Sequence, residues 1–136
     1  MNLRPLVAAL RQQSGLLAKR DIQPAAEAFS HRPFPQLGAA GMLGDDAALL
    51  PRQTGQGLRA CEGMHPGLVE DDPWFAGWSG VLVNLSDIAA MGGRPLALVN
   101  SVWSQGPESQ AELLAGMRFA CDRFAIPMVG GHSNQH

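Results

Sequence analysis

One segment constrains the fold of this chain more than any other: residues 72–91, which carry helix-starting residues at one end and a helix-ending residue at the other. Asp72 is a good N-cap, and Pro73 fits the first helical position, where no backbone N–H is needed. Gly92 suits the C′ position, where many helices end in a left-handed conformation. We therefore predict a helix over 72–91. Three residues inside it lower helix propensity and indicate close approach by another backbone or a ligand: Gly77, Ser79 and Gly80.

The remaining segments predict short strands and helices in a defined order. An amphipathic helix is expected over 2–19 with Asn2 as its cap, and it is followed by a loop-rich segment over 21–41. Strands are predicted at 47–51, 58–64, 95–103 and 126–132, and a further helix follows Gly106-Pro107. This order indicates an α/β or α+β fold with helices packed on a sheet. The length of 136 residues suits a single domain, 1–136, whose core spans 42–134.

For two of these predicted strands, the sequence also indicates how the strand is buried or where it ends. The segment 95–103 is almost continuously apolar, which is typical of a strand that is buried on both faces. The segment 126–132 contains Gly130 and Gly131, and we expect the strand to end there in a glycine turn.

Composition excludes several classes of function. The formal charge is −2 and the basic residues are scattered, so nucleic acid and anionic membranes are not expected as partners. Cys61 and Cys121 are far apart in sequence and have no zinc-like spacing, so we interpret both as reduced core residues. The apolar stretch at the N-terminus is too short for a signal or a membrane span, which predicts a cytoplasmic protein.

Polar clusters lie at the ends of four predicted elements, at 44–48, 61–65, 84–87 and 130–134. Asn84 and Asp87 are three residues apart and share one helix face. Asp87 lies one turn from the predicted helix end, where the partial negative charge makes a carboxylate unfavourable. Converging carboxylates favour a hard cation such as Mg²⁺, usually held together with phosphates. Taken singly, the clusters at 44–48 and 130–134 are better explained by ordinary turns, and Asp87 is equally well explained by a solvated helix end.

Three stretches change this balance when they are taken together. "GDDAALL", "GWSGVLVNLSDIAAMGGRP" and "VGGHSN", in this order and at these separations, resemble the N-terminal half of the aminoimidazole-ribotide-synthase superfamily. That group includes thiamine-monophosphate kinase, selenophosphate synthetase and a hydrogenase-maturation protein, and the resemblance covers roughly residues 40–134. "EGMH" and "VNLSDIAAMG" are similar to the kinase, whereas "LVEDDPWFAG" and "GGHS" are similar to the synthetase.

The resemblance implies a fold, ligands and a site. The implied fold is a four-stranded mixed sheet with helices on one face, and two such sheets pair into a barrel-like homodimer. The implied ligands are Mg²⁺ and ATP, and the implied metal ligands are Asp45, Asp46, Asp87 and Glu62. Nucleotide contacts are implied for Asn84, Asp87, Gly130, Gly131, His132 and Lys19.

Several positions depart from the pattern of the family. Aligning on "EGMH" places Leu58 where the kinase has a metal-binding aspartate, whereas aligning on the "DDP" element brings Glu62 near that position. Glu62 would then be a longer acid in the site or an ordinary surface residue. His132 stands where the kinase has an aspartate, although the synthetase also has histidine. Lys19 lacks the neighbouring cysteine of the synthetase, which argues against selenium chemistry.

The other chemically suggestive side chains receive simpler interpretations. His65 is a candidate site residue and His31 a surface residue. The three tryptophans are expected in the core or in a dimer interface: Trp74, Trp78 and Trp103.

Two hypotheses of function follow from the resemblance. The first is the Mg-ATP-binding N-terminal half of a kinase or synthetase that phosphorylates or activates an unidentified small molecule and is inactive without the family's C-terminal domain. The second is a non-catalytic dimerisation or nucleotide-binding module. Because the chain combines features of the kinase and the synthetase, we expect it to be a related member of the superfamily that is neither of these two enzymes.

Overall fold

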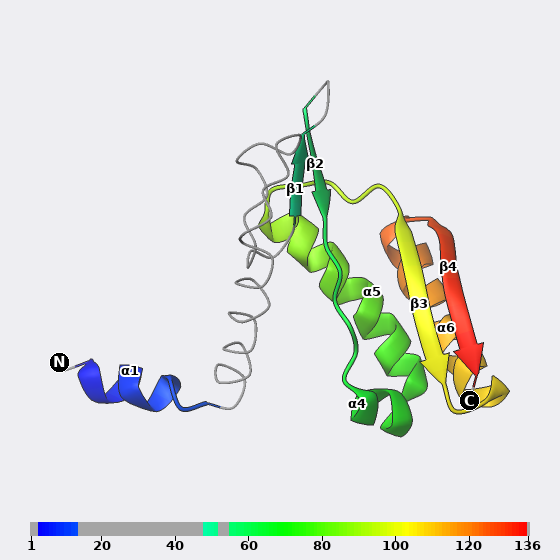
Figure 1. Ribbon diagram of the computed structural model, residues 1–136, viewed down its shortest axis with the longest axis horizontal. Helices are drawn as coiled ribbons and strands as arrows, with labels where there is room; N and C mark the ends of the chain where they lie inside the picture. The colour runs from blue at the N-terminus through cyan, green and yellow to red at the C-terminus, as the bar shows by residue number, and fades with distance from the viewer. Residues whose placement is uncertain (1–2, 14–47, 52–54, 136) are drawn as a thin grey trace, which may run out of the picture. The chain divides into compact units, whose positions relative to one another are not determined.

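The computed structural model describes residues 3–13, 48–51 and 55–135, which fall into two compact units, Met1–Gly57 and Leu58–His136. The first unit contains helix α1 (Arg4–Leu10) and strand β1 (Ala48–Pro51), which pairs with β2 (Gln56–Arg59) in a two-stranded sheet. The second unit contains α4 (Pro66–Asp71), α5 (Pro73–Ala90), β3 (Leu98–Ser104), α6 (Pro107–Phe124) and β4 (Met128–Gln135) (Figure 1).

Helix α1 is shorter than predicted in the described part of the chain. It ends at Leu10 and is followed by a turn at residues 11–13, whereas the prediction extended to residue 19. Its N-cap is Leu3, which makes no side-chain hydrogen bond, and the predicted cap Asn2 lies outside the described residues. The remainder of the predicted helix and the predicted loop-rich segment 21–41 also lie outside them.

Helix α5 confirms the helix that was predicted over residues 72–91. The Asp72 carboxylate accepts a hydrogen bond from the Phe75 N–H at 2.9 Å, and Pro73 occupies the first turn. At the other end Gly92 has a φ of 72°, as a C′ glycine requires. The Gly93 N–H donates to the Ile88 carbonyl at 2.8 Å and the Gly92 N–H donates to the Ala89 carbonyl at 2.9 Å. These two bonds form a Schellman motif that ends the helix.

Helices α5 and α6 cross at very short distance. A Cβ atom on Gly77 would overlap the Leu113 carbonyl, and a Cβ atom on Gly116 would overlap the Trp74 carbonyl. Each helix therefore places a glycine against the backbone of the other. This confirms for Gly77 the expectation that another backbone comes close to α5. Gly80 does not face α6; the Met64 side chain lies against it instead.

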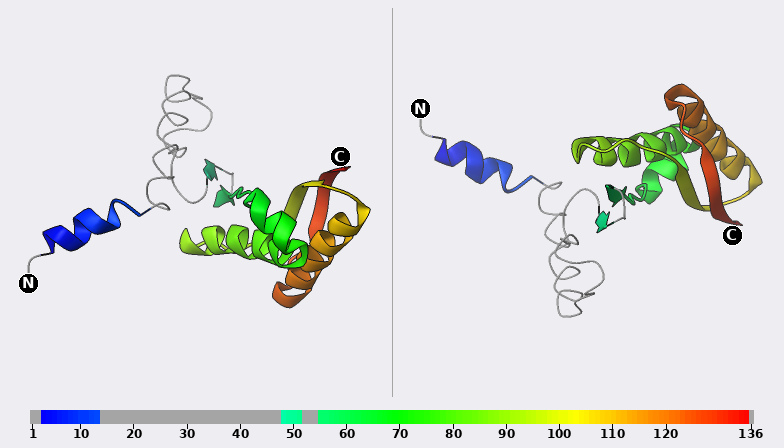
Figure 2. Two further views of the ribbon diagram at one scale, coloured as in Figure 1. Left: turned by 90° about the horizontal axis from the view of Figure 1, so that it is seen from below. Right: turned by 90° about the horizontal axis from the view of Figure 1, so that it is seen from above.

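Strands β3 and β4 form a parallel pair that α6 connects, and α5 and α6 lie on one side of it (Figures 1 and 2). Both helices contribute to a common buried cluster, and Leu98 and Met128 of the strands pack against this cluster. The core residues are Val81, Leu85, Ala120 and Cys121.

The opposite side of the β3–β4 pair is exposed, with Val99 at 73% and Trp103 at 54% of full exposure. The prediction that residues 95–103 are buried on both faces is therefore wrong for this chain by itself. The burial alternates along β3, so one face meets the helices and the other meets solvent.

The predicted glycine turn at residues 130–132 is also wrong. Gly130 and Gly131 lie inside β4 and pair with Val99 and Asn100 of β3. A Cβ atom on Gly131 would overlap the Asn100 side chain, so the glycine makes room for that amide rather than for a turn. The strand continues to Gln135.

The predicted four-stranded sheet is not found among the described strands, which form two separate pairs, β1–β2 and β3–β4. The predicted strand 58–64 ends at Arg59, and helix α4 follows His65. His65 caps α4, because its Nδ1 accepts a hydrogen bond from the Gly67 N–H at 3.2 Å. Pro66 in the first turn was the signal for this helix in the sequence.

The described helices include none that is both long enough and apolar enough to cross a membrane.

Candidate functional site

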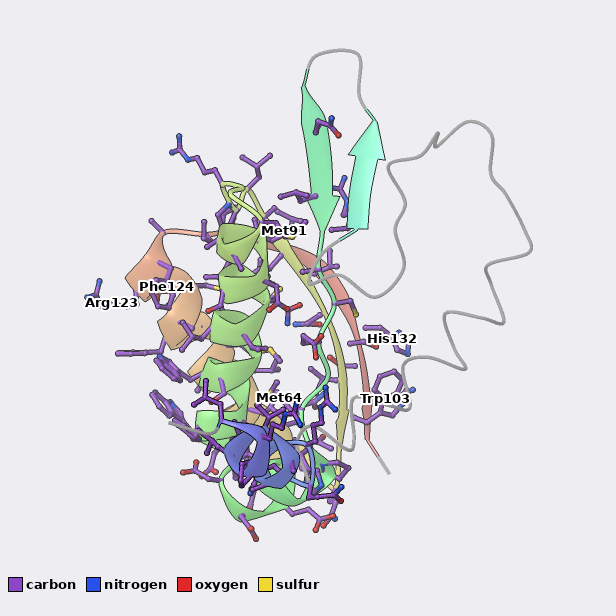
Figure 3. All side chains as sticks on the ribbon, turned by 90° about the vertical axis from the view of Figure 1, so that its left-hand side faces the viewer. Met64, Met91, Trp103, Arg123, Phe124 and His132 are labelled. Atoms are coloured by element: carbon purple, nitrogen blue, oxygen red, sulfur yellow. The ribbon has the colours of Figure 1, made fainter. Side chains whose placement is uncertain are left out.

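Residues 58–65 form an extended segment that runs along α5 and contacts this helix and its C-terminal end at three positions along the helix axis. Leu58 lies against Gly93, just beyond the C-terminal end of the helix. Glu62 is hydrogen-bonded to Asn84 near the middle. Met64 lies against Gly80, closer to the N-terminal end, and Figure 3 shows Met64 and Met91 well apart along the helix. The segment and α5 are therefore antiparallel.

Asn84 is the polar link between them. Its Oδ1 accepts a hydrogen bond from the Glu62 N–H at 2.9 Å, and its Nδ2 donates to the Glu62 carbonyl at 3.4 Å. The same Nδ2 also donates to the Gly80 carbonyl one turn earlier, at 2.8 Å. The structure thus brings together two predicted site residues that are 22 positions apart in sequence.

Asp87 lies in the last turn of α5, three residues after Asn84 on the same helix face. Its side chain is half-buried, and within the described residues its carboxylate forms neither a hydrogen bond nor an ion pair. The last turn of α5 carries no basic residue that would offset the charge. The unfavourable position that the sequence indicated is thus present in the structure.

The glycine-histidine segment occupies a different element, strand β4. His132 is exposed, and its ring lies 6.3 Å from the ring of Trp103, edge to face. Figure 3 shows both side chains on the side of the β3–β4 pair away from α5. Among the described contacts, none joins His132 to Asn84 or Asp87.

Three predicted site residues, Lys19, Asp45 and Asp46, lie outside the described residues. Within the described part of the chain, no group of three or more histidine, cysteine, aspartate or glutamate side chains is placed to hold a metal ion. The predicted metal set therefore stays a prediction, with Glu62 and Asp87 as its described members.

The structure assigns other roles to several residues. Asn100, which the sequence analysis missed, fills the space beside Gly131, and its Nδ2 lies 3.9 Å from the sulfur of Met117. An isolated asparagine in an apolar strand was the available signal. Trp74 and Trp78 form ring contacts with Phe119 and Phe75 on the helical side.

The two cysteines differ, contrary to prediction. Cys121 is buried in the core, but Cys61 is exposed. Burial raises the pKa of the Cys121 thiol, and the neighbouring Asp122 carboxylate adds to this effect. Cys121 also lines an open pocket of about 260 Å³ between α6 and the start of β4, together with Met117 and Met128.

Fold and site together define an α/β domain with an acidic residue at a glycine-terminated helix end and a Gly-Gly-His strand. The family described as AIR synthase related protein, N-terminal domain, matches residues 44–136. The chain belongs to this family.

Individual relatives support the same assignment. An uncharacterized protein of Synechocystis sp. is 48% identical over 134 residues, which are 98% of this chain and 41% of that protein. Thiamine-monophosphate kinase of Methanospirillum hungatei is 33% identical over 97 residues, covering 68% of this chain and 33% of the kinase. Selenide, water dikinase of Aeromonas hydrophila is 32% identical over 103 residues, covering 73% of this chain and 30% of the dikinase. The chain thus spans less than half the length of these relatives, and both enzymes of the predicted resemblance are among them.

A solved structure shows the same fold. AaThiL complexed with AMPPCP and TMP superposes with a TM-score of 0.66 at 20% identity, covering 85% of this chain and 36% of that one. The mixed α/β architecture with helices and a parallel strand pair is therefore similar to that of AaThiL.

Proposed function

We propose that this chain is the Mg-ATP-binding N-terminal domain of an AIR-synthase-like phosphotransferase or synthetase, which phosphorylates or activates a small molecule. One observation carries the proposal: α5 holds the half-buried Asp87 carboxylate, without a described protein partner, on the same face as the Asn84–Glu62 contact. An acid at a helix C-terminus is unfavourable without a cation, and a bound Mg²⁺ would offset that charge. The family match and the AMPPCP bound to the solved neighbour support a nucleotide as the ligand.

The donor chemistry fits the proposed metal. Carboxylate oxygens are the ligands that Mg²⁺ prefers, and Mg²⁺ is usually bound by one or two carboxylates together with substrate phosphates. Asp87 and Glu62 would supply such oxygens, with Asp45 and Asp46 as further ligands. When bound, Mg²⁺ would neutralise charge on the phosphate oxygens. The chain's own contribution is then to position the phosphates, with Gly130, Gly131, His132 and Lys19 as proposed nucleotide neighbours.

Calorimetric titration of the intact protein with ATP tests this proposal. We expect binding in the presence of Mg²⁺ and much weaker binding with EDTA in its place. The variant Asp87→Asn should lose most of the Mg²⁺-dependent affinity. An ATP affinity that changes neither on removal of Mg²⁺ nor on substitution of Asp87 would overturn the proposal.

We also propose a homodimer that forms through the exposed side of the β3–β4 pair. This side presents Val99 and Trp103 to solvent, and large exposed apolar groups that lie together mark interaction sites. Light scattering should give the mass of two chains. A monomer at high protein concentration would contradict the dimer.

Two departures favour the alternative, a nucleotide-binding or dimerisation module without catalysis. His132 stands where the kinase has an aspartate, and Leu58 packs against Gly93 instead of presenting an acid. A turnover assay on the intact protein separates the two functions. ATP consumption that depends on a small-molecule acceptor, measured as ADP formation or phosphate release, would exclude the alternative.

A further inference from the structure

We infer that Asn84 is a positioning residue that holds Glu62 in place for the cation and nucleotide site, instead of contacting the nucleotide itself. This inference rests on the proposed function and assigns a different role to Asn84 than the resemblance implied. It starts from the three hydrogen bonds of a single side-chain amide.

The hydrogen-bonding capacity of Asn84 is largely used within the chain. A side-chain amide has two N–H donors, and Nδ2 donates to the carbonyls of Gly80 and Glu62. Oδ1 already accepts from the Glu62 N–H at 2.9 Å. A nucleotide contact through Nδ2 would have to break one of these bonds, so the geometry favours a role inside the protein.

Asn84 supplies the backbone contacts that a neighbouring strand would supply. It bonds to both the N–H and the carbonyl of Glu62, as a strand neighbour does. Within the described residues, the main chain at 60–64 makes no backbone–backbone hydrogen bond. The apolar contacts of Leu58 and Met64 hold the two ends of the segment, and Asn84 is the described polar contact between them.

This arrangement places the main chain of Glu62 within about one helical turn of the position of Asp87 along α5. Asp87 follows Asn84 by three residues, which is a displacement of about 4.5 Å along a helix axis. Glu62 is tied by its main chain to the Asn84 side chain, while its own side chain remains exposed. The bonds of Asn84 therefore restrict where the Glu62 carboxylate can lie before any ligand arrives. Outer contacts of this kind change metal affinity by about 10- to 100-fold when removed.

Two measurements on the intact protein test the inference. The first is amide hydrogen exchange of Glu62, which should be slow in the wild type and at least ten-fold faster in Asn84→Ala. Ser86→Ala is the matched control, because Ser86 is exposed on the same helix and, in the described part of the chain, its hydroxyl donates only to the Leu82 carbonyl of that helix, at 2.8 Å. We expect it to leave the Glu62 amide unchanged.

The second measurement is calorimetric titration with Mg·AMPPCP. Asn84→Ala should weaken binding about 10- to 100-fold, and Ser86→Ala should not. If Asn84 acts through Glu62, then Asn84→Ala should cost little further affinity in a Glu62→Gln background. A purely structural role would weaken binding by the same factor in both backgrounds. If Asn84→Ala does not fold, Asn84→Ser removes the same paired bonds with less loss of polarity.

The outcomes separate this inference from the proposed function. Additive losses, or a Glu62 amide that exchanges equally fast in the wild type and in Asn84→Ala, would overturn the positioning role alone. A wild-type protein that binds no Mg·AMPPCP would overturn the proposed function and, with it, the role of Asn84 in that site.

Discussion

Gly77 of α5 lies directly against the main-chain carbonyl of Leu113 in α6, and Gly116 occupies the reciprocal position against Trp74. The backbones approach so closely that neither position has room for a methyl group. Interhelical distance at this crossing is therefore set by the absence of side chains.

Substitution of Gly77 by alanine should destabilise the domain strongly. The new Cβ would overlap the Leu113 carbonyl, so the helices would have to separate, at a cost of about 2 kcal/mol or more. Gly80→Ala is the matched control, because its Cβ would lie 3.5 Å from Met64 in ordinary contact. It should be neutral or stabilising by up to about 1 kcal/mol through helix propensity. Urea unfolding of both variants checks the prediction, and equal midpoints would contradict it.

Substitution of Asp72 by alanine should lower the free energy of unfolding by about 1 kcal/mol. The change removes the carboxylate that accepts from the Phe75 N–H at the start of α5. Asp71→Ala, one residue earlier and exposed, has no such cap to lose and should change stability by less than about 0.5 kcal/mol. Thermal unfolding of the pair gives the comparison. A larger effect at Asp71 would show that the local charge, rather than the cap, stabilises the helix.

Asp87→Asn should separate stability from binding. In the ligand-free protein the substitution removes a negative charge from the last turn of α5 and should stabilise by a few tenths of a kcal/mol. The same variant should lose Mg²⁺-dependent ATP binding. Asp122→Asn makes the equivalent change in the last turn of α6, where the ion pair with Arg118 is exposed and contributes little. Asp122→Asn should keep ATP binding, and the two variants are compared by calorimetry and thermal unfolding. Loss of stability in Asp87→Asn without loss of binding would show that the acid serves the fold.

Ala125→Gly should stabilise the end of α6. Ala125 has a φ of 53°, a left-handed conformation that costs an ordinary residue about 1 kcal/mol and glycine little. Ala115→Gly, at an exposed position inside the same helix, should instead destabilise by about 1 kcal/mol. Opposite shifts in the urea midpoint are expected, and a destabilised Ala125→Gly would contradict the prediction.

The stability of the domain should decline in alkaline solution because of Cys121. Burial raises the pKa of its thiol above the ordinary value of 9.0, with a further contribution from Asp122. The unfolded thiol ionises first, so this contribution is fully present below the unfolded pKa and is lost as the pH rises through the folded pKa. Unfolding free energies measured from about pH 8 to pH 10.5 should fall less steeply in Cys121→Ala than in the wild type. Cys61→Ala, which changes an exposed thiol, should keep the wild-type slope.

The sequence predicted those features that depend on neighbouring residues. The start of α5 at Asp72 and its end at Gly92 are decided within a few positions, and both predictions are confirmed. The family also followed from short contiguous stretches, and the match over 44–136 confirms it.

Features that depend on distant pairing were less accessible. Gly131 looked like a turn because the partner that explains it, Asn100, comes from another strand. The bond between Asn84 and Glu62 joins residues 22 positions apart, and nothing in either neighbourhood specifies the other. The proposed metal ligands Asp45 and Asp46 lie outside the described residues, so the complete site stays a prediction.

The uncovered side of the β3–β4 pair has a practical consequence for handling the protein. Strand β3 presents Val99 and Trp103 to water beside the exposed His132. Contact between such surfaces is favourable whenever molecules meet, because it removes apolar area from water. Colloidal behaviour, rather than unfolding, should therefore set the concentration at which this chain can be kept in solution by itself.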